Sequence, residues 1–366
     1  MSEKRSVRQV VFLLPSGSNK PAGGYKVVYE YANRLVADGY DVAIVYPAYG
    51  FKFGQSRAVA FLRRCKALLR FLYWGASKKY SCRSWFDLDR RVKERWTWSL
   101  ACRLPKGESY VATAIQTSTY LHQHREIANE RKFYLIQHFE SWGGATSQDV
   151  LDTYHYPLRK IVIARWLEKI VHNAREECVL IPNGFDFNYF KMTTDIIRRD
   201  RFTICMLYHL SDWKGCADGF RALDIVKAKY PDLRVNIFGV PPRPDGLPEW
   251  YHYIQRPDRE THNRLYNESA IFIGTSWSEG WGLTVGEAMI CGCAVACTDN
   301  AGYLEMASDG ETALVSPVKD ADALAANIIR LIEDDSLRFR IAEAGNCNIR
   351  RFTWDKAYEK LKQALN

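Results

Sequence analysis

The sequence predicts an α/β protein built from two doubly wound, Rossmann-like domains that face each other across a central cleft. Three observations support this prediction. The chain has 366 residues, enough for about two domains at roughly 150 residues each. Short apolar runs alternate with amphipathic helical patterns, which is typical of parallel sheets with crossover helices. These runs fall into two sets that separate near residues 183–200, where turn residues and charges gather and an interdomain linker is expected.

Nine apolar runs are expected to form buried strands, at 9–14, 41–46, 110–115, 133–137, 178–182, 201–207, 234–239, 270–275 and 293–298. Between the first two runs, residues 25–38 place Val27, Val28, Tyr31 and Leu35 on one face and stop before Gly39, which predicts an amphipathic helix. Ligands of doubly wound sheets bind at the carboxyl ends of the strands. The loops that follow strands are therefore the places to look for chemistry.

The loop after the run at 270–275 carries the most informative residues. It contains Glu279 and two glycines, and a helix that carries Glu287 is expected to begin near Leu283. Glycines let the backbone approach a ligand closely, and the amides at a helix start favour an anion such as a diphosphate. A carboxylate can accept hydrogen bonds from a vicinal diol such as that of a ribose. The alternative is that both glutamates are solvated surface charges, but the loop as a whole favours a binding site.

This segment resembles the Glu-x7-Glu motif of retaining glycosyltransferases with the GT-B fold, in particular family four. The family typically reads E-G-F-G-L-x-x-x-E-A-M-A-x-G, and Trp281 replaces the usual phenylalanine here. The resemblance implies the GT-B fold and a nucleoside-diphosphate-sugar donor. It implies that Glu287 binds the ribose hydroxyls and that Glu279 contacts the transferred sugar as a catalytic residue. The backbone amides that it assigns to the diphosphate are those near Gly282, Leu283 and Thr284.

Two further segments support the resemblance. The run CVLIPNGFDFNYF is similar to the family's I-P-N-G-V-D-x-x-x-F signature at the domain junction. The run after residue 205 is similar to a stretch that reads G-R-x-x-x-x-K-G, with Lys214 and Gly215 matching and His209 at the arginine position. A lysine there would bind the donor and stabilise the leaving diphosphate. A histidine is mostly neutral at pH 7, so either His209 does a weaker version of the arginine's work or another basic residue substitutes.

The first half contains a second set of candidate residues. Gly23 and Gly24 lie at the start of the predicted helix and make a turn that favours an anion. The resemblance places a glycine pair against the donor's phosphates and assigns acceptor binding to this domain. His138 follows the run at 133–137 and is similar to the family's catalytic position that contacts the transferred sugar. A satisfied structural histidine is the alternative interpretation.

The predicted domains are 1–185, on the acceptor side, and 186–352, which binds the nucleotide sugar. The resemblance implies that a final helix, 353–366, packs back on the first domain. Residues 51–106 lack any match to the family and contain 15 Lys or Arg and 3 acidic residues, whereas the whole chain has a net charge of only +9. The positive excess therefore belongs to this insertion.

A basic amphipathic helix is expected within the insertion. Its apolar face has Ala58, Phe61, Leu62, Cys65, Leu68, Leu69 and Leu72, and its basic face has Arg63, Arg64, Lys66 and Arg70. One interpretation is association of residues 57–74 with an anionic membrane surface. The other is a helix that packs its apolar face on the domain core. Phe71 and Trp74 lie off the apolar stripe, which favours a partner or lipid for them.

Several classes of protein and site are excluded. No run approaches the ~18 apolar residues of a membrane-spanning helix, and the first residues lack the pattern of a signal peptide. We therefore expect a cytoplasmic protein, with peripheral binding to the inner face of the cytoplasmic membrane left open. No nucleic-acid-binding motif is present. The D-x-D of Asp87 and Asp89 matches a metal-binding motif of glycosyltransferases of another fold, but its basic, helical context points to coincidence, and no metal or other cofactor is expected.

The sequence thus predicts a retaining glycosyltransferase that moves a sugar from a nucleoside-diphosphate donor to a hydroxyl of a glycan or lipid-linked glycan acceptor. Synthesis of a cell-surface polysaccharide or glycoconjugate is the expected context. Two alternatives stay open. A GT-B nucleotide-sugar epimerase would use the same cleft without an acceptor, and a non-catalytic GT-B scaffold subunit would bind no nucleotide.

Overall fold

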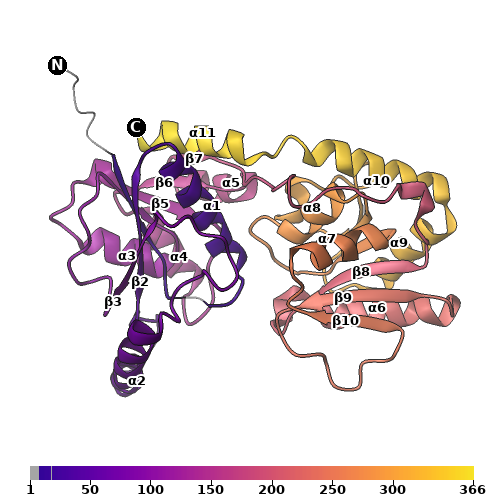
Figure 1. The fold of residues 1–366 in the computed structure, drawn as a ribbon, viewed down its shortest axis with the longest axis horizontal. Coiled ribbons are helices and arrows are strands. Elements are labelled where there is room, and N and C mark those ends of the chain that lie inside the picture. The colour runs from indigo at the N-terminus through magenta and orange to yellow at the C-terminus, as the bar shows by residue number, and fades with distance from the viewer. Residues whose placement is uncertain (1–7, 18) are drawn as a thin grey trace. The chain divides into compact units, whose positions relative to one another are not determined.

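The computed structural model describes residues 8–17 and 19–366, and the chain divides into two compact units (Figure 1). The first unit is Met1–Pro182 together with Ala357–Asn366, and the second is Asn183–Lys356. The boundaries expected from the sequence were 1–185 and 186–352, with the last helix assigned to the first domain. Part of the segment tested for a signal peptide, residues 1–7, lies outside the described residues.

The N-terminal unit is a parallel sheet with crossover helices. Its strands are β1 (Gln9–Leu13), β2 (Asp41–Pro47), β3 (Lys93–Thr97), β4 (Ser109–Ala112), β5 (Lys132–Ile136), β6 (Arg159–Val162) and β7 (Cys178–Leu180). Its helices are α1 (Gly23–Ala37), α2 (Arg57–Ser77), α3 (Ile115–Gln123), η1 (Asn129–Arg131), α4 (Ser147–Tyr154) and α5 (Arg165–Asn173). Among the described residues, the strand order is β3-β2-β1-β4-β5-β6-β7, and the paired strands are parallel.

Helix α1 illustrates how local sequence builds this unit. Its apolar residues recur at helical spacing, so that Val27, Val28, Tyr31 and Leu35 are buried on one face. The helix ends at Ala37 with Asp38 as its cap. Gly39 then takes a positive φ of 86°, a conformation that glycine adopts without steric cost. The helix predicted over 25–38 is confirmed, with its start two residues earlier.

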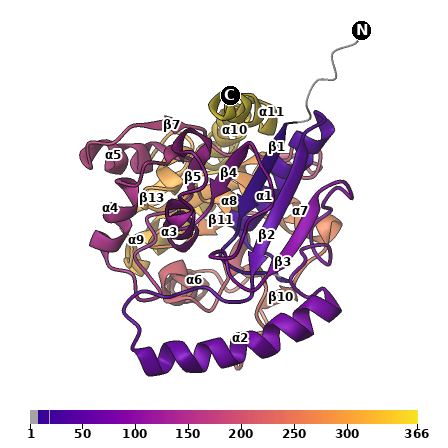
Figure 2. The same cartoon turned by 90° about the vertical axis from the view of Figure 1, so that its left-hand side faces the viewer.

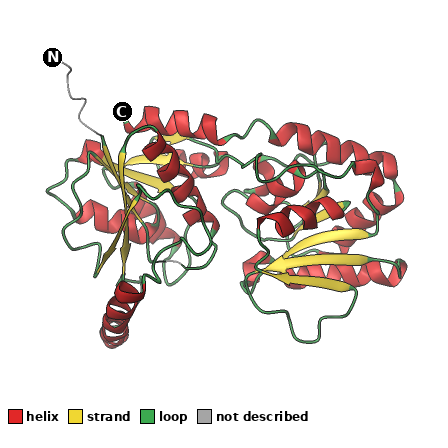
Figure 3. Cartoon of the chain, viewed as in Figure 1, coloured by secondary structure: helices red, strands yellow, loops and turns green. Residues whose placement is uncertain are grey.

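The C-terminal unit repeats the same architecture. Its strands are β8 (Thr203–Tyr208), β9 (Arg234–Gly239), β10 (Tyr251–Gln255), β11 (Ile271–Gly274), β12 (Ala294–Thr298) and β13 (Leu314–Ser316). Its helices are η2 (Ile196–Arg198), η3 (Asp212–Lys214), α6 (Cys216–Lys229), α7 (Arg259–Glu268), α8 (Leu283–Ile290), η4 (Tyr303–Glu305), α9 (Ala321–Glu333) and α10 (Asp335–Ile349). The sheet order is β10-β9-β8-β11-β12-β13, and Figure 3 shows helices on both sides of the strands.

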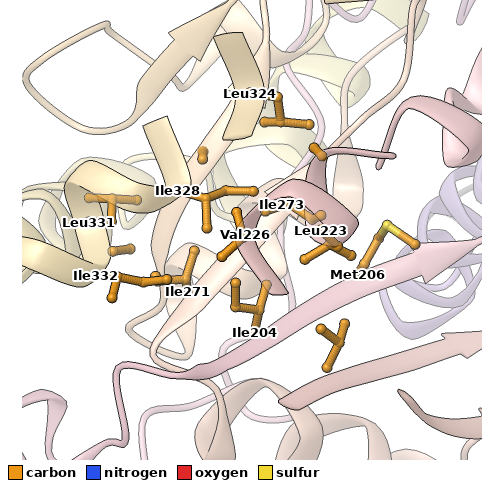
Figure 4. Close-up of a cluster of buried hydrophobic side chains, with 14 of the residues drawn as sticks. Ile204, Met206, Leu223, Val226, Ile271, Ile273, Leu324, Ile328, Leu331 and Ile332 are labelled. Carbon is orange, nitrogen blue, oxygen red and sulfur yellow. The ribbon is translucent and has the colours of Figure 1, made fainter. Parts of the chain in front are cut away.

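The core of the C-terminal unit is aliphatic. Figure 4 shows side chains of β8 and β11, such as Ile204 and Ile271, packed against Val226 of α6 and Ile328 of α9. Each of these four side chains is fully buried. Truncating any of the three isoleucines to alanine would cost about 2–5 kcal/mol. This core therefore fixes the strand ends from which the functional loops leave.

The last helix, α11 (Trp354–Leu365), belongs mainly to the N-terminal unit. Tyr358 donates a hydrogen bond of 2.8 Å to Asp38, and the Lys362 ammonium lies 2.9 Å from the same carboxylate. These bonds hold the pKa of Asp38 below its ordinary value. The helix therefore attaches to the end of α1 through polar contacts.

The predicted fold class, two doubly wound α/β domains, is confirmed, and each of the nine predicted strands overlaps an observed one. Strands β3, β6, β10 and β13 were not predicted. The interpretation of residues 183–200 as an interdomain linker was wrong. That segment packs within the C-terminal unit, where the Asn267 side chain accepts from Thr193 N and donates to Lys191 O.

Candidate functional site

Two loops at the carboxyl edge of the C-terminal sheet are tied together by hydrogen bonds. One follows β8 and contains η3, and the other joins β11 to α8. Thr275 Oγ1 donates to Lys214 O at 2.7 Å, and Trp277 N donates to Trp213 O at 2.7 Å. Gly215 takes a positive φ of 61° between the two loops, and a Cβ there would overlap Thr275 O. Only glycine therefore permits this close approach.

The tied loops bring Lys214 and Glu279 into direct contact. The Lys214 ammonium lies 2.6 Å from Glu279 Oε1, and the two side chains are only 21% and 15% exposed. Ser276 Oγ donates to the same oxygen at 2.7 Å, and Tyr303 OH donates to Ser276 Oγ at 3.1 Å. Glu279 Oε1 is thus held by both a cation and a hydroxyl.

The start of α8 is shaped by close packing. Gly282 has a φ of 90°, and a Cβ at this position would overlap the ring of Tyr303. The helix begins directly after it, at Leu283. The first amides of a helix lack intrahelical partners and carry a partial positive charge. Two groups that suit an anion, these amides and the Lys214 ammonium, therefore belong to loops at the same sheet edge.

Glu287 lies one turn further along α8 and is buried, with 5% of its surface exposed. Tyr266 OH donates to Glu287 Oε2 at 3.4 Å, and the carboxylate raises the pKa of Tyr189 after the larger effect of burial. Glu287 is therefore not a solvated surface charge, which excludes that alternative interpretation.

His209 lies directly after β8. Its Nδ1 accepts a hydrogen bond of 3.0 Å from Ser211 N, so Nε2 carries the proton in the neutral ring. Burial lowers the pKa of His209, the Lys214 charge lowers it further, and Glu279 opposes the shift. The ring is therefore neutral at pH 7 and offers one donor near Lys214. This agrees with the weaker donor that the sequence indicated and does not reproduce an arginine.

The candidate residues of the first half lie together in the N-terminal unit. Gly24 is the second residue of α1, and a Cβ there would lie 3.4 Å from the Gln137 amide. His138 follows at the end of β5, with its ring 4.7 Å from that of Trp142 and 5.5 Å from that of Trp166. The glycine turn therefore lies against the side chain of Gln137, the residue that precedes His138.

The sequence analysis missed Glu140, which lies two residues beyond His138. Its Oε2 accepts a hydrogen bond of 2.6 Å from Ile115 N, the first residue of α3. Burial raises the pKa of Glu140 to about 7, and the bond from Ile115 only partly opposes this. A carboxyl group that titrates near neutral pH at a strand end is a candidate for proton transfer. The sequence did offer one signal for Glu140, because it is a carboxylate in the same strand-following loop as His138.

Ser276 and Tyr303 were also missed, although both position Glu279. No described cluster of three or more His, Cys, Asp or Glu side chains is arranged to hold a metal ion. Asp89 of the D-x-D pattern instead pairs with Arg91 at 2.7 Å.

Residues 194–346 match the family model for glycosyl transferases group 1. The chain carries a group 1 glycosyltransferase domain. This domain contains Lys214, Glu279 and Glu287, so the predicted resemblance to GT-B glycosyltransferases of family four is confirmed at the level of the family.

The group 1 domain has curated relatives. Phosphatidyl-myo-inositol mannosyltransferase of Mycolicibacterium smegmatis is 26% identical over 223 residues, which cover 57% of this chain and 57% of the relative. The match thus spans little more than half the length of that protein.

Solved structures show the same fold around the group 1 domain and beyond it. Sucrose-phosphate synthase of Thermosynechococcus elongatus aligns with a TM-score of 0.70 at 17% identity, covering 97% of this chain and 98% of that one. HepE of Anabaena, crystallised with UDP-glucose, gives a TM-score of 0.70 at 17% identity and covers 98% of this chain and 99% of that one. At these identities the likeness establishes the GT-B fold alone.

Proposed function

We propose that the protein is a retaining glycosyltransferase that moves a sugar from a nucleoside-diphosphate sugar to a hydroxyl of a glycan or lipid-linked glycan acceptor. The observation that carries the proposal is the partly buried Lys214–Glu279 contact beside the start of α8, in a group 1 domain. The named relative is a mannosyltransferase, and HepE was crystallised with UDP-glucose. Both support a nucleotide sugar as donor without identifying its base or its sugar.

The chemistry assigned to each residue follows from charge. Breaking the bond to the sugar leaves negative charge on the diphosphate, and a preplaced cation stabilises that charge in the transition state. Lys214 supplies the cation, and the amides at Gly282, Leu283 and Thr284 supply further donors. Neutral His209 adds one hydrogen bond through Nε2. Because protein groups provide this charge, we propose that transfer requires no resident metal ion.

Glu279 and Glu287 have different parts in the proposal. Glu279 is paired with Lys214. When the donor's diphosphate binds the Lys214 ammonium, the Glu279 carboxylate is released to accept hydrogen bonds from the hydroxyls of the transferred sugar. Glu287 would accept from the ribose. Gly23, Gly24 and His138 lie in the N-terminal unit, where we propose that the glycine turn contacts the donor's phosphates and His138 the transferred sugar.

The test is a transfer assay with labelled UDP-, GDP-, ADP- and dTDP-sugars, with and without lipid-linked and soluble glycan acceptors, in buffer containing EDTA. The proposal expects label in an acceptor from at least one donor, with the anomeric configuration of the donor retained. An isomerised nucleotide sugar formed without acceptor would show an epimerase instead. Absence of both transfer and nucleotide binding would show a scaffold subunit.

A further inference from the structure

Helix α2 of the insertion presents an exposed apolar face. The helix is 21 residues long, is capped by Ser56, and buries only Ala67 fully. Its exposed large apolar residues include Leu69 at 71%, Phe61 at 66% and Leu72 at 61%. Figure 2 shows α2 lying lengthwise along the lower border of the N-terminal unit. We call Phe61, Leu62, Leu68, Leu69 and Leu72 the α2 stripe.

The opposite face of α2 attaches the helix to the domain. The rings of Phe71 and Trp74 stack on Trp96 with centroids 6.2 and 5.9 Å apart, and Trp96 Nε1 donates to Phe71 O at 2.9 Å. Arg63 donates to Gly50 O from the same face. Two expectations from the sequence are therefore wrong. The predicted apolar face does not pack on the core, and Phe71 and Trp74 have a partner within the domain.

The positions of these residues around the helix axis explain which face is buried. At 100° per residue, positions 63, 67, 71 and 74 share one side of the helix, and the α2 stripe is centred nearly opposite to them. The aromatic residues of β3 and the following loop supply the surface that Phe71 and Trp74 cover. The apolar periodicity in the sequence therefore marked a real face, but a different side of the helix became buried.

Basic residues border the α2 stripe on both sides. Arg57 and Arg64 lie along one border, and Lys66 and Arg70 lie along the other, while α2 contains no acidic residue. Arg64 also lies over the Tyr49 ring, 5.5 Å from its centroid. A stripe of large apolar residues between two rows of cations matches the boundary between lipid headgroups and acyl chains. A second copy of the same face would bring like charges together, which opposes dimerisation through it.

The helix lies at the sheet edge that carries the candidate residues of this unit. A Cβ on Gly17, in the loop between β1 and α1, would meet Trp74 at 3.2 Å and Tyr80 at 2.6 Å. The same loop leads into Gly24, where an added Cβ would lie 3.4 Å from the side chain of Gln137, just after β5. A surface held against the α2 stripe would therefore lie beside the carboxyl ends of the N-terminal strands.

We propose that the α2 stripe docks the protein on an anionic lipid membrane, with Leu69 and its neighbours among the acyl chains and the bordering cations among the headgroups. Docking in this orientation would present the carboxyl edge of the N-terminal sheet to a lipid-linked acceptor. The use of such an acceptor rests on the proposed function; the docking itself does not.

The test is flotation of the full-length protein, without donor, with vesicles of phosphatidylcholine alone or with about 30% phosphatidylglycerol. This proportion of phosphatidylglycerol makes the vesicle surface strongly anionic. Wild type should bind the anionic vesicles and bind the neutral ones weakly. Leu69→Glu should reduce binding about tenfold or more. Ile197→Glu is the matched control, because Ile197 is 63% exposed outside α2, and it should bind like wild type.

A second variant tests the charges. Arg64→Gln combined with Lys66→Gln and Arg70→Gln should weaken binding to anionic vesicles by about fivefold for each charge removed. Thermal unfolding and nucleotide-sugar binding should be unchanged in these variants, which shows that the fold and the donor site are intact.

Three results would overturn docking: equal binding of wild type and Leu69→Glu, equal binding to neutral and anionic vesicles, or a wild-type dimer that Leu69→Glu converts to monomer. Vesicle binding by a wild type that binds no nucleotide sugar would instead sustain docking and refute the proposed function. The two proposals can therefore fail separately.

Discussion

Replacing Lys214 by methionine removes a cation 2.6 Å from Glu279 Oε1 and leaves a side chain of similar length. Exposed ion pairs contribute about 0.2–1 kcal/mol, whereas breaking a fully buried pair costs about 3–5 kcal/mol. With side chains 21% and 15% exposed, and with Ser276 still donating to Glu279, we expect a loss of about 2 kcal/mol. For a unit of this size the melting temperature should fall by about 4–8 °C.

A matched control is available in the same unit. Lys229 and Glu333 form a lysine–glutamate pair at the same distance, 2.6 Å, but both side chains are 51% exposed. Lys229→Met should therefore lower stability by about 1 kcal/mol or less. Added salt should shrink the effect at Lys229 more than the effect at Lys214, because buried pairs are screened less.

The assay is thermal unfolding of both variants at low and high salt, followed by steady-state kinetics with the donor that proves active. Lys214→Met should also lower kcat/KM by about 10²–10³, the usual cost of losing one preplaced group that stabilises transition-state charge. Lys229→Met should leave kcat/KM unchanged. Equal melting shifts for the two variants, or full activity of Lys214→Met, would refute the reasoning.

Three further predictions concern other residues. Burial raises the pKa of Glu140 from 4.5 to about 7, so the folded state loses stability as the pH rises from 4.5 to about 7. Glu140→Gln should remove this loss. Stability curves of wild type and Glu140→Gln that run parallel from pH 4.5 to 7 would contradict the prediction. Gly282→Ala should lower the free energy of unfolding by more than the ~1–3 kcal/mol of a strained backbone, because its Cβ would overlap Tyr303. Gly246→Ala, at φ 70° with nothing within 4 Å of the added Cβ, should lower it only by the backbone strain. Chemical denaturation of the two variants measures the difference. Glu287→Gln keeps the shape of a buried side chain and should weaken nucleotide binding about tenfold or more, and an unchanged affinity in calorimetry would exclude its ribose role.

Much of the fold could be predicted because central parallel strands are buried on both faces and therefore appear as continuous apolar runs. Strands β3, β10 and β13, which escaped prediction, are edge strands. The fourth edge strand of the described sheets, β7, was predicted from its apolar run. An edge strand has a neighbour on one side only and tolerates charge, as Lys93 and Arg95 in β3 show. Strand β6 is internal, but it has four residues and begins with Arg159 and Lys160, which hid its apolar character.

The candidate site could be predicted in part. Glu279, Glu287 and Lys214 stand in short motifs with fixed spacing, so the sequence alone marked them. Tyr303 could not be found in this way, because its contacts with Gly282 and Ser276 depend on how the loop after β12 folds back. The exposed face of α2 shows a related limit, since periodicity indicates that a helix has an apolar face but not which surface covers it.

The central claim is that the C-terminal unit binds a nucleoside-diphosphate sugar through Lys214 and the start of α8. Calorimetric titration of UDP-, GDP-, ADP- and dTDP-sugars into wild type, Lys214→Met and Lys229→Met tests it most directly. The account predicts that at least one of these donors binds wild type and Lys229→Met equally and Lys214→Met at least tenfold more weakly. At about 100 times its dissociation constant, that donor should also add roughly 2.7 kcal/mol of stability to wild type. Failure of all four donors to bind wild type, or equal affinity for Lys214→Met, would contradict the account.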